Sequence, residues 1–344
     1  MRVISGEDAW ASFRTNKAFR WGQHSPKDAP APSRTGKLVM LPRVSPKFRF
    51  DAKETIFTIG SCFARHVESV LETYGYRFRT RNPENFVSPE ECTSANGFFN
   101  KYTTASMLNE IRWAVSGEPF PEAGFTEADG RWSDGQLPAN FASLARAKEI
   151  RARVSSIMAD VRSADYLILT LGLVECWHDA ETNLYLNGAP TAGTIKKYPH
   201  RFNVHVLDYR ANMAALEELH DRVTAVNPGI RLIVTVSPVP LGATFTGEDI
   251  VAANSYSKST LRAVAGDFTA ARSTADYFPS YEAVTESSPP ATWMDDMIHV
   301  RIELVRCVIA HFVKHYGSPE IAALVDLDAV LATLAGAMPF RAAG

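Results

Sequence analysis

The sequence is poor in cysteine, and the few cysteines that it has are scattered. Four occur in 344 residues, with no C-x-x-C pair among them. This spacing argues against a zinc knuckle or a redox dithiol, and a disulfide framework is uncommon in a chain of this length. The loop histidines likewise form no pair that suggests metal ligands. The sequence therefore predicts no metal and no other cofactor.

Long apolar runs and a strong charge of one sign are also absent. No stretch of about 18 apolar residues occurs, and the N-terminal "MRVISGEDAWASFRTNKAFRWG" has no apolar signal-peptide core. The formal net charge of -2 gives no electrostatic reason to expect nucleic acid or an anionic membrane as a partner. We therefore expect neither a membrane span nor nucleic-acid binding, and a reducing, cytoplasmic location.

The sequence does contain buried strands that alternate with amphipathic helices. Apolar runs such as "TIFTIG" and "DYLILTLG" end in glycine and are typical of strands buried on both faces of a parallel sheet. The expected strands are 55–60, 165–172, 230–238 and, with the loop after it, 275–284. The expected helices are 63–76, 103–117, 140–164, 205–229, 249–270, 299–316 and 318–337. This alternation predicts an α/β fold with a mainly parallel sheet.

The domain organisation follows from changes in composition. The first 50 residues are irregular and rich in Pro, Lys and Arg, so a disordered tail is one interpretation of this segment. Aromatic residues spread through this segment favour instead an N-terminal arm, 1–50, that packs on the body. They are Trp10, Phe13, Phe19, Trp21 and Phe48. No linker or repeat interrupts the rest, so we expect one domain over 51–320 and a C-terminal helix and tail over 321–344.

Sites in open parallel sheets lie beyond the carboxyl ends of the strands. Four stretches occupy such positions: Gly60 to Cys62, Gly172 to Glu175, Ser237 with Pro238, and the loops from Tyr277 to His299. Each ends a strand with glycine or polar residues. Ser237-Pro238 is also explained as a rigid turn.

Cys62 is the candidate nucleophile. A thiol at the start of a helix lies near its positive end, which favours the reactive thiolate. His66 follows four residues later and would share the same helix face. The alternative is that Ser61 caps the helix, Cys62 fills a small buried space and His66 is a surface residue.

A candidate base follows near the C-terminus, in "WMDDMIHV". Asp296 and His299 have D-x-x-H spacing, in which the carboxylate can fix the tautomer and orientation of the imidazole. The alternative places these acids at a helix N-terminus, where the dipole favours them. A further residue, Lys258 in "NSYSKS", could lie near an anionic group, but we favour a solvated helix face.

The order of these stretches resembles the SGNH, or GDSL-type, hydrolase superfamily. At the family level, the chain is similar to the GSCFA family, whose motif occurs here at Gly60 to Ala64. The stretches "LTLGLVECW", "VTVSPVPLGAT", "NSYSKSTLR" and "DYFPSYEAV" carry the same resemblance, which covers roughly residues 15 to 315. The resemblance implies a flavodoxin-like three-layer αβα fold, and its superfamily implies a hydrolase or acyltransferase.

The chain departs from the superfamily pattern at two positions. Cys62 stands where the superfamily has its nucleophilic serine, and Ser61 stands where it has aspartate, so Ser61 is the second candidate nucleophile. Gly172 matches the oxyanion glycine, but Glu175 rather than asparagine ends that block. The missing side-chain donor would then be Asn100 or Asn96. Glu175, beside Trp177, is a candidate for substrate binding.

The resemblance implies an acyl-transfer mechanism. His299, oriented by Asp296, would accept the proton of Cys62, and the thiolate would attack an ester or an acyl thioester donor. Backbone N–H groups near Gly60, Cys62 and Gly172 would stabilise the oxyanion. The acyl group would pass to water or to a sugar hydroxyl, as in a carbohydrate O-acyl esterase or O-acyltransferase.

Two other functional classes stay open. The protein could be a non-catalytic carbohydrate- or partner-binding module that retains the fold, and the missing asparagine favours that alternative. A thiol redox sensor at Cys62 ranks last, because no resolving cysteine is identifiable. Aromatic residues near the expected site, Tyr102 and Trp177 among them, suit stacking on a sugar but are also explained as core residues.

Overall fold

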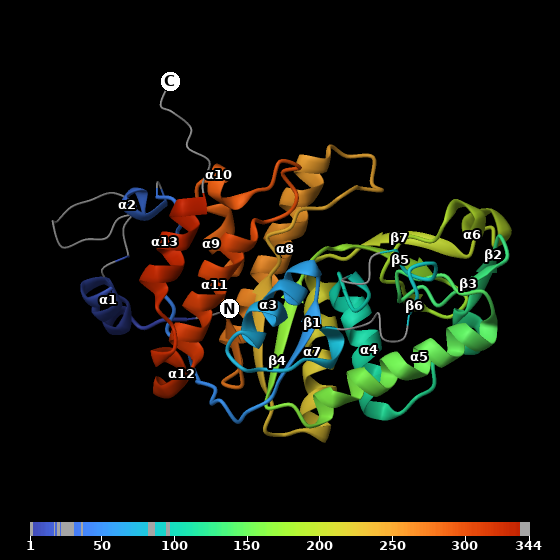
Figure 1. Ribbon diagram of the computed structural model, residues 1–344, viewed down its shortest axis with the longest axis horizontal. Helices are drawn as coiled ribbons and strands as arrows, with labels where there is room; N and C mark the ends of the chain where they lie inside the picture. The colour runs from blue at the N-terminus through green and yellow to red at the C-terminus, as the bar shows by residue number, and fades with distance from the viewer. Residues whose placement is uncertain are drawn as a thin grey trace.

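A parallel four-stranded sheet forms the centre of the molecule (Figure 1). The computed structural model describes residues 3–16, 18, 21, 31–35, 37–81, 87–93 and 97–337. The strands lie in the order β1-β4-β8-β9, and each neighbouring pair is parallel. Their bounds are Ile56–Gly60 (β1), Tyr166–Leu171 (β4), Arg231–Val236 (β8) and Ala275–Tyr277 (β9). Every residue of β1 and β4 is buried, as their continuous apolar runs predict.

Helices cover both faces of the sheet, which confirms the three-layer α/β fold. Successive strand residues point to opposite faces, so Phe57 and Ile59 belong to one apolar core while Ile56 and Ile168 belong to the other. The first core is completed by α4 (Thr104–Ser116), α5 (Leu144–Met158), α7 (Tyr209–Val226) and α8 (Ile250–Ala270). The second is completed by α3 (Cys62–Glu72), α9 (Ser280–Thr285) and α11 (Ile302–Tyr316).

Helix ends follow local capping residues. Thr103 and Ser106 form a capping box at the start of α4, and Gly117 ends that helix with a φ of 71°. The other helices are α1 (Gly6–Thr15), α2 (Pro32–Thr35), α6 (Ala192–Lys197), α10 (Pro289–Thr292), α12 (Pro319–Ala323) and α13 (Leu327–Ala337). Short 3₁₀ helices span Arg79–Arg81, Glu122–Gly124 and Ala159–Arg162. No helix among the described residues is both long and apolar enough to cross a membrane.

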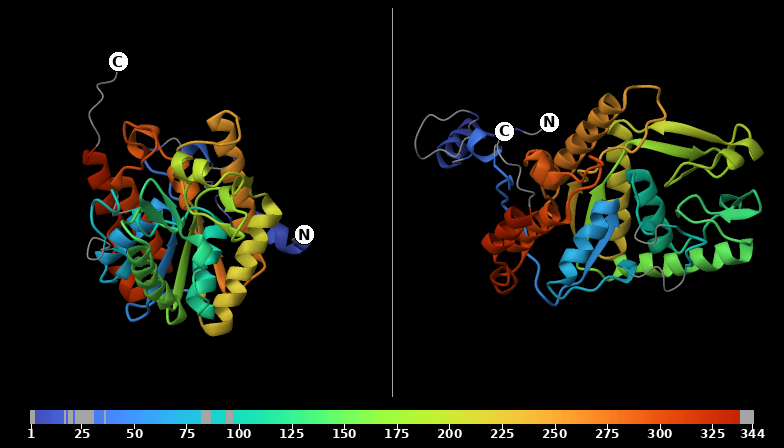
Figure 2. Two further views of the ribbon diagram at one scale, coloured as in Figure 1. Left: turned by 90° about the vertical axis from the view of Figure 1, so that its right-hand side faces the viewer. Right: turned by 45° about the horizontal axis from the view of Figure 1, so that its top comes forward.

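Two small antiparallel sheets lie beside the main body and were not predicted. They extend from the side opposite to α12 and α13 (Figure 2). One has the order β6-β5-β7 and the other is the hairpin β2-β3. Their strands are β2 (Thr126–Ala128), β3 (Arg131–Ser133), β5 (Glu175–Asp179), β6 (Leu184–Tyr185) and β7 (Phe202–Val206). These strands are short and only partly buried, so no continuous apolar run marks them.

Three predicted elements have different bounds in the structure. The helix expected over 205–229 begins at Tyr209, because Phe202–Val206 pairs with β5 as β7. In the segment 275–284, expected to be a strand and the loop after it, β9 ends at Tyr277, before Pro279, which has no N–H to donate to a strand neighbour, and helix α9 follows in place of a loop. The helix expected over 318–337 is divided into α12 and α13.

The N-terminal segment contacts the body through its later residues. The Nζ of Lys47 donates to the carbonyl oxygens of Thr269, Arg272 and Ala275, and Phe50 is fully buried. By contrast, α1 buries none of its residues. Trp10 and Trp21 are 62% and 75% exposed, and Phe19 lies outside the described residues.

Candidate active site

A cleft with a volume of about 730 Å³ opens where β1, β4 and β8 end. The residues that follow these strands line it, namely Ser61, Gly172 and Ser237. The rest of the wall is formed by Cys62, Arg65, His66, Ser69, Arg81, Gly97, Asn100, Tyr102, Pro138, Leu173, Val239, Pro240, Gly242, Ile298 and His299. The cleft therefore lies at the carboxyl edge of the sheet, where a site is expected in this architecture.

Gly60 and Ser61 shape the turn from β1 into α3. A Cβ on Gly60 would lie 2.5 Å from the Cβ of Thr170 and 2.7 Å from its carbonyl oxygen, so only glycine permits this approach to β4. Ser61 is the N-cap of α3, and its buried Oγ accepts from the N–H of Phe63 at 3.4 Å. The same hydroxyl donates to the Oγ of Ser237 at 2.9 Å. Both contacts give Ser61 a structural role.

Cys62 is the first residue of α3 and lies half-buried on the wall of the cleft. Burial raises the pKa of its thiol, while the N–H groups of Phe63 and Cys62 and the charge of Lys258 act to lower it. The helix N-terminus therefore favours the thiolate as expected, but burial has the larger effect. The other three cysteines are fully buried. A base is accordingly needed to deprotonate Cys62.

Asp296 and His299 form a hydrogen-bonded pair in the loop before α11. The Nδ1 of His299 lies 2.5 Å from the Oδ2 of Asp296. The Oδ1 of Asp296 accepts from the N–H groups of Ile298 and His299, both at 2.9 Å. These bonds, with the His299 side chain first, lower the pKa of Asp296 to about 2. The pair precedes α11, which begins at Ile302, so the helix-terminus alternative does not account for it.

His66 and His299 approach the cleft together with Cys62. Burial lowers the pKa of His66, and the charges of His299 and Arg81 lower it further, which places His66 in electrostatic reach of His299. Among the described residues, no hydrogen bond joins the Sγ of Cys62 to His299. Such contacts often tighten only in the complex with substrate. The structure therefore brings nucleophile and base candidates into one cleft without a direct contact between them.

The loop that ends at Tyr102 is fixed against the ends of β1 and β4. The N–H groups of Gly172 and Leu173 donate to the carbonyl oxygen of Tyr102 at 3.0 and 2.8 Å, and the N–H of Lys101 donates to Gly60 at 2.7 Å. A Cβ on Gly172 would lie 2.7 Å from the carbonyl oxygen of Tyr102. Gly172 thus permits a close backbone approach. Its N–H, expected to bind the oxyanion, is already hydrogen-bonded.

Asn100 and Tyr102 present polar side-chain groups to the cleft. The Nδ2 of Asn100 donates to the hydroxyl of Tyr102 at 3.2 Å, while its buried Oδ1 has no partner among the described residues. Burial raises the pKa of Tyr102, and the charge of Cys62, which lines the same cleft, raises it further. Asn96, the other donor considered, lies outside the described residues.

Glu175 and Trp177 lie on β5, away from the cleft wall. The carboxylate of Glu175 accepts from the hydroxyl of Thr244 at 2.6 Å and from the N–H of Phe245 at 2.8 Å. The ring of Trp177 packs edge-on against Phe245, with centroids 5.1 Å apart. These contacts hold the 244–245 loop on β5, and neither residue is among those that line the cleft.

Lys258 lies next to the candidate site, in an environment that the sequence analysis assigned wrongly. The expectation of a solvated helix face was wrong, because Lys258 is only 1% exposed. Its Nζ donates to the carbonyl oxygens of Gly172 at 2.8 Å and Val239 at 2.6 Å. Burial lowers its pKa to about 7, and the charge of Cys62 opposes that shift. Lys258 lies three residues before the buried Leu261, and this helical spacing could have indicated that Lys258 is on the buried face of the helix.

The buried ammonium of Lys258 predicts a pH-dependent stability. Between about pH 7 and its ordinary pKa of 10.5, the unfolded chain holds a proton that the folded chain has released, so stability rises with pH in this window. From pH 7 to 9, urea melts of the wild type should gain about 1–2 kcal/mol relative to Lys258→Met. Lys314→Met is the matched control, because the exposed Lys314 also donates to two carbonyl oxygens. Equal gains in wild type and Lys258→Met would contradict this account.

The charged side chains on the cleft wall are cationic. Arg65 and Arg81 line the cleft, and no carboxylate does so among the described residues. Arg65 pairs with the buried Glu68 at 2.8 Å, and the Nε of Arg81 lies 3.4 Å from Glu72. The wall therefore suits negative charge in a substrate or transition state better than positive charge. The described residues contain no group of three or more His, Cys, Asp or Glu arranged to hold a metal ion.

The sequence model of the GSCFA family matches residues 55–312. The matched part runs from the residue before β1 into α11, and so includes Cys62, Asn100, Gly172, Lys258 and His299. The comparison with curated proteins gave no match, and neither did the comparison with solved structures.

Proposed function

The chain belongs to the GSCFA family, and we propose that it is an acyl-transfer enzyme that acts on ester or thioester bonds through Cys62. The observation that carries the proposal is the shared cleft. Cys62 begins a helix at the edge of the parallel sheet, and His299, held by Asp296, lines the same cavity. Placement in the SGNH/GDSL-like superfamily is part of the proposal and supports the reaction class by analogy.

The first half of the reaction transfers the acyl group to Cys62. The Nε2 of His299 accepts the thiol proton, and Asp296 keeps Nδ1 as the donor, so the imidazolium is stabilised as it forms. The sulfur bonds to the carbonyl carbon, and the tetrahedral intermediate collapses with release of the alcohol or thiol. The leaving group takes its proton from His299. The product is a thioester on Cys62.

The second half transfers the acyl group from Cys62 to an acceptor. Water or a sugar hydroxyl gives its proton to His299 and attacks the thioester, and Cys62 leaves and is reprotonated. A thioester retains acyl-transfer potential, which supports transfer to a hydroxyl as well as hydrolysis. The substrate class that we propose is an O-acylated carbohydrate, as for an O-acyl esterase or O-acyltransferase.

Asn100 is the side-chain oxyanion donor in this proposal. The N–H of Gly172 is bonded to Tyr102, which leaves the Nδ2 of Asn100 and the hydroxyl of Tyr102 as side-chain donors in the cleft that Cys62 lines. In other enzymes one such donor contributes about 3–4 kcal/mol to transition-state stabilisation. Gly60 contributes to the site by fixing the turn from β1 into α3.

Two observations favour the alternative of a non-catalytic binding module. The occupied N–H of Gly172 removes an expected oxyanion donor, and no hydrogen bond joins Cys62 to His299 among the described residues. A protein that keeps only the fold would bind its ligand in this cleft without forming a covalent intermediate.

Acyl-enzyme trapping tests the proposal directly. The protein is mixed with an aryl acetate, quenched in acid within seconds and measured by intact-mass spectrometry, and the labelled peptide is then sequenced. We expect the mass of one acetyl group, located on Cys62 and absent from Cys62→Ala. Label on Ser61 would reassign the nucleophile. No label in the wild type, together with no turnover of any ester tested, would leave the binding module as the better account.

A further inference from the structure

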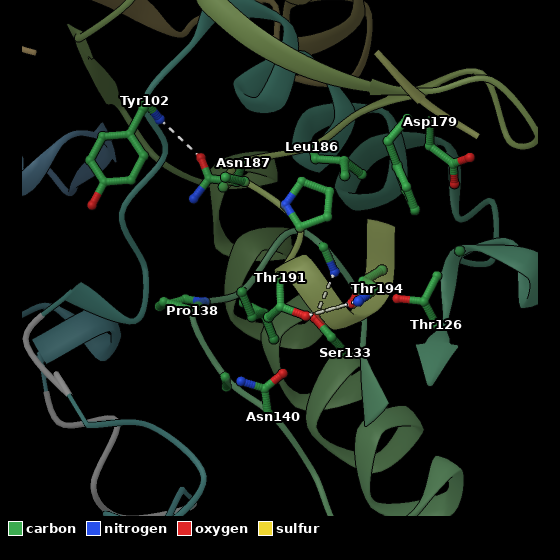
Figure 3. A pocket seen from close by; sticks show the side chains of 18 residues that line it. Tyr102, Thr126, Ser133, Pro138, Asn140, Asp179, Leu186, Asn187, Thr191 and Thr194 are labelled. Carbon is green, nitrogen blue, oxygen red and sulfur yellow. Dashed lines mark hydrogen bonds between the residues drawn. The ribbon is translucent and has the colours of Figure 1, made fainter. Parts of the chain in front are cut away.

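A second pocket, of about 260 Å³, lies next to the cleft (Figure 3). Its walls come from the hairpin β2-β3, from the loop at 135–140 and from the segment between β6 and α6. None of these elements belongs to the central sheet. The small antiparallel sheets beside the body therefore enclose a cavity of their own at the margin of the candidate active site.

Tyr102 and Pro138 line both the pocket and the cleft. The N–H of Tyr102 donates to the Oδ1 of Asn187 in the pocket wall at 3.0 Å. Its hydroxyl accepts from Asn100 in the cleft, and Figure 3 shows the phenol directed away from Asn187. The two cavities thus meet at Tyr102 and Pro138. A ligand whose reacting bond lies beside Cys62 can place the group attached to that bond in the pocket.

The uncharged polar side chains of the pocket wall carry hydroxyl and amide groups. The hydroxyl of Thr126 and the amide of Asn140 line it, and neither side chain has a hydrogen-bond partner among the described residues. Thr126 is nonetheless buried, so its free hydroxyl faces the cavity rather than bulk solvent. Figure 3 shows it directed toward Thr194 across the pocket. Apolar contacts come from Leu186 and from other residues of the wall.

The electrostatics of the pocket disfavour an anionic ligand. Asp179 is the one charged side chain among the described residues that line it. Its carboxylate accepts from Arg201 at 2.8 and 2.6 Å and from the hydroxyl of Thr182 at 2.8 Å, so it is already paired. A phosphate or a sugar acid would lose its hydration in this pocket, and no cationic side chain among the described residues lines the wall to compensate for that loss. A neutral group carries no such cost.

We propose that this pocket is a subsite for one neutral sugar ring. A sugar ring combines apolar C–H faces with hydroxyl edges, which matches a wall of apolar side chains, hydroxyls and amides. A volume of about 260 Å³ is below the roughly 300–1,000 Å³ of pockets for drug-sized ligands, so it suits a single ring rather than an oligosaccharide. The subsite depends on the proposed function in one respect: only if Cys62 reacts with acyl esters does a sugar bound here place such an ester beside Cys62.

Binding measured without turnover tests the subsite independently of the chemistry. Saturation-transfer NMR is recorded on the Cys62→Ala protein with the methyl glycosides of glucose, galactose, mannose and N-acetylglucosamine. Glucuronate and glucose 6-phosphate serve as anionic comparisons. We expect at least one neutral glycoside to bind, and to bind this pocket more tightly than either anion does. No binding by any neutral glycoside, or stronger binding by an anion that the pocket variants locate in this pocket rather than in the cationic cleft, would overturn the proposal.

Pocket variants then locate the bound sugar. Thr126→Val removes the free hydroxyl, and Thr126→Ser keeps it as the matched control. Loss of one such hydrogen bond should weaken binding roughly tenfold in the valine variant only. Gly188→Trp narrows the rim at an exposed position where an added Cβ meets no atom within 4 Å, so the fold should be kept. Unchanged affinity in both Thr126→Val and Gly188→Trp, with unchanged thermal unfolding, would place the sugar elsewhere.

The two proposals can fail separately. A glycoside that binds this pocket in a protein without esterase or transferase activity supports the subsite and contradicts the enzyme. An acyl-enzyme on Cys62 in a protein that binds no glycoside supports the enzyme and contradicts the subsite.

Discussion

Replacing Cys62 with alanine is expected to lower kcat/KM for an aryl acetate by at least roughly 10³-fold. The alanine variant retains the cleft and the Asp296–His299 pair, but it has no atom that can form the acyl-enzyme. Because Cys62 is half-buried at the first position of α3, loss of its sulfur should change stability little. The measurement is steady-state hydrolysis of the aryl acetate at saturating and at low substrate.

Two variants serve as controls for this result. Ser61→Ala removes the N-cap and the bond to Ser237, which should cost about 1 kcal/mol of stability and less than roughly tenfold in kcat/KM. Cys307→Ala removes a fully buried thiol from α11, outside the cleft, and should leave kcat/KM within about twofold. Turnover that survives Cys62→Ala and disappears in Ser61→Ala would assign the reaction to Ser61.

The parts of the fold that the sequence predicts correctly are those with a strong local pattern. The runs at β1, β4 and β8 are continuous and apolar because these strands are buried on both faces. The Gly60 turn and the Asp296–His299 spacing are likewise local, so each is recognisable within a few residues. Each strand of the small sheets has two to five residues, most of them only partly buried, and the pairing of β5 with β7 joins residues distant in sequence.

The site residues that could not be predicted depend on contacts between distant segments. The N–H of Lys101 donates to the carbonyl oxygen of Gly60, which is 41 residues earlier in the sequence. No local sequence pattern predicts that the loop before Tyr102 packs against the end of β4. Lys258 lies on the apolar stripe of α8. Lysine side chains are usually exposed, so the residue type alone predicts the wrong burial at this position. The state of Cys62 depends on burial competing with the helix N-terminus, and burial is known only from the fold.

Replacing His299 with glutamine is expected to lower kcat/KM roughly 10²–10⁴-fold, because the thiol of Cys62 then has no base. Burial raises the pKa of that thiol, so little thiolate forms at neutral pH without proton transfer. His66→Gln is the matched control, since His66 lines the same cleft from α3 but has no carboxylate partner among the described residues. A loss in His66→Gln as large as that in His299→Gln would show that the two histidines had been assigned the wrong roles.

Asp296→Asn separates the orientation of the imidazole from its basicity. The pKa of Asp296 is lowered to about 2, so the carboxylate is ionised at every working pH and is lost only as the pH falls toward 2. The loss of kcat/KM in Asp296→Asn should therefore be nearly constant from about pH 5 to 9, and a wild-type acid limb in that range cannot come from Asp296. A loss confined to one end of the range would indicate instead that position 296 acts through its own titration. A constant loss with normal thermal unfolding would assign to Asp296 the task of holding His299 in the tautomer whose Nε2 faces the cleft.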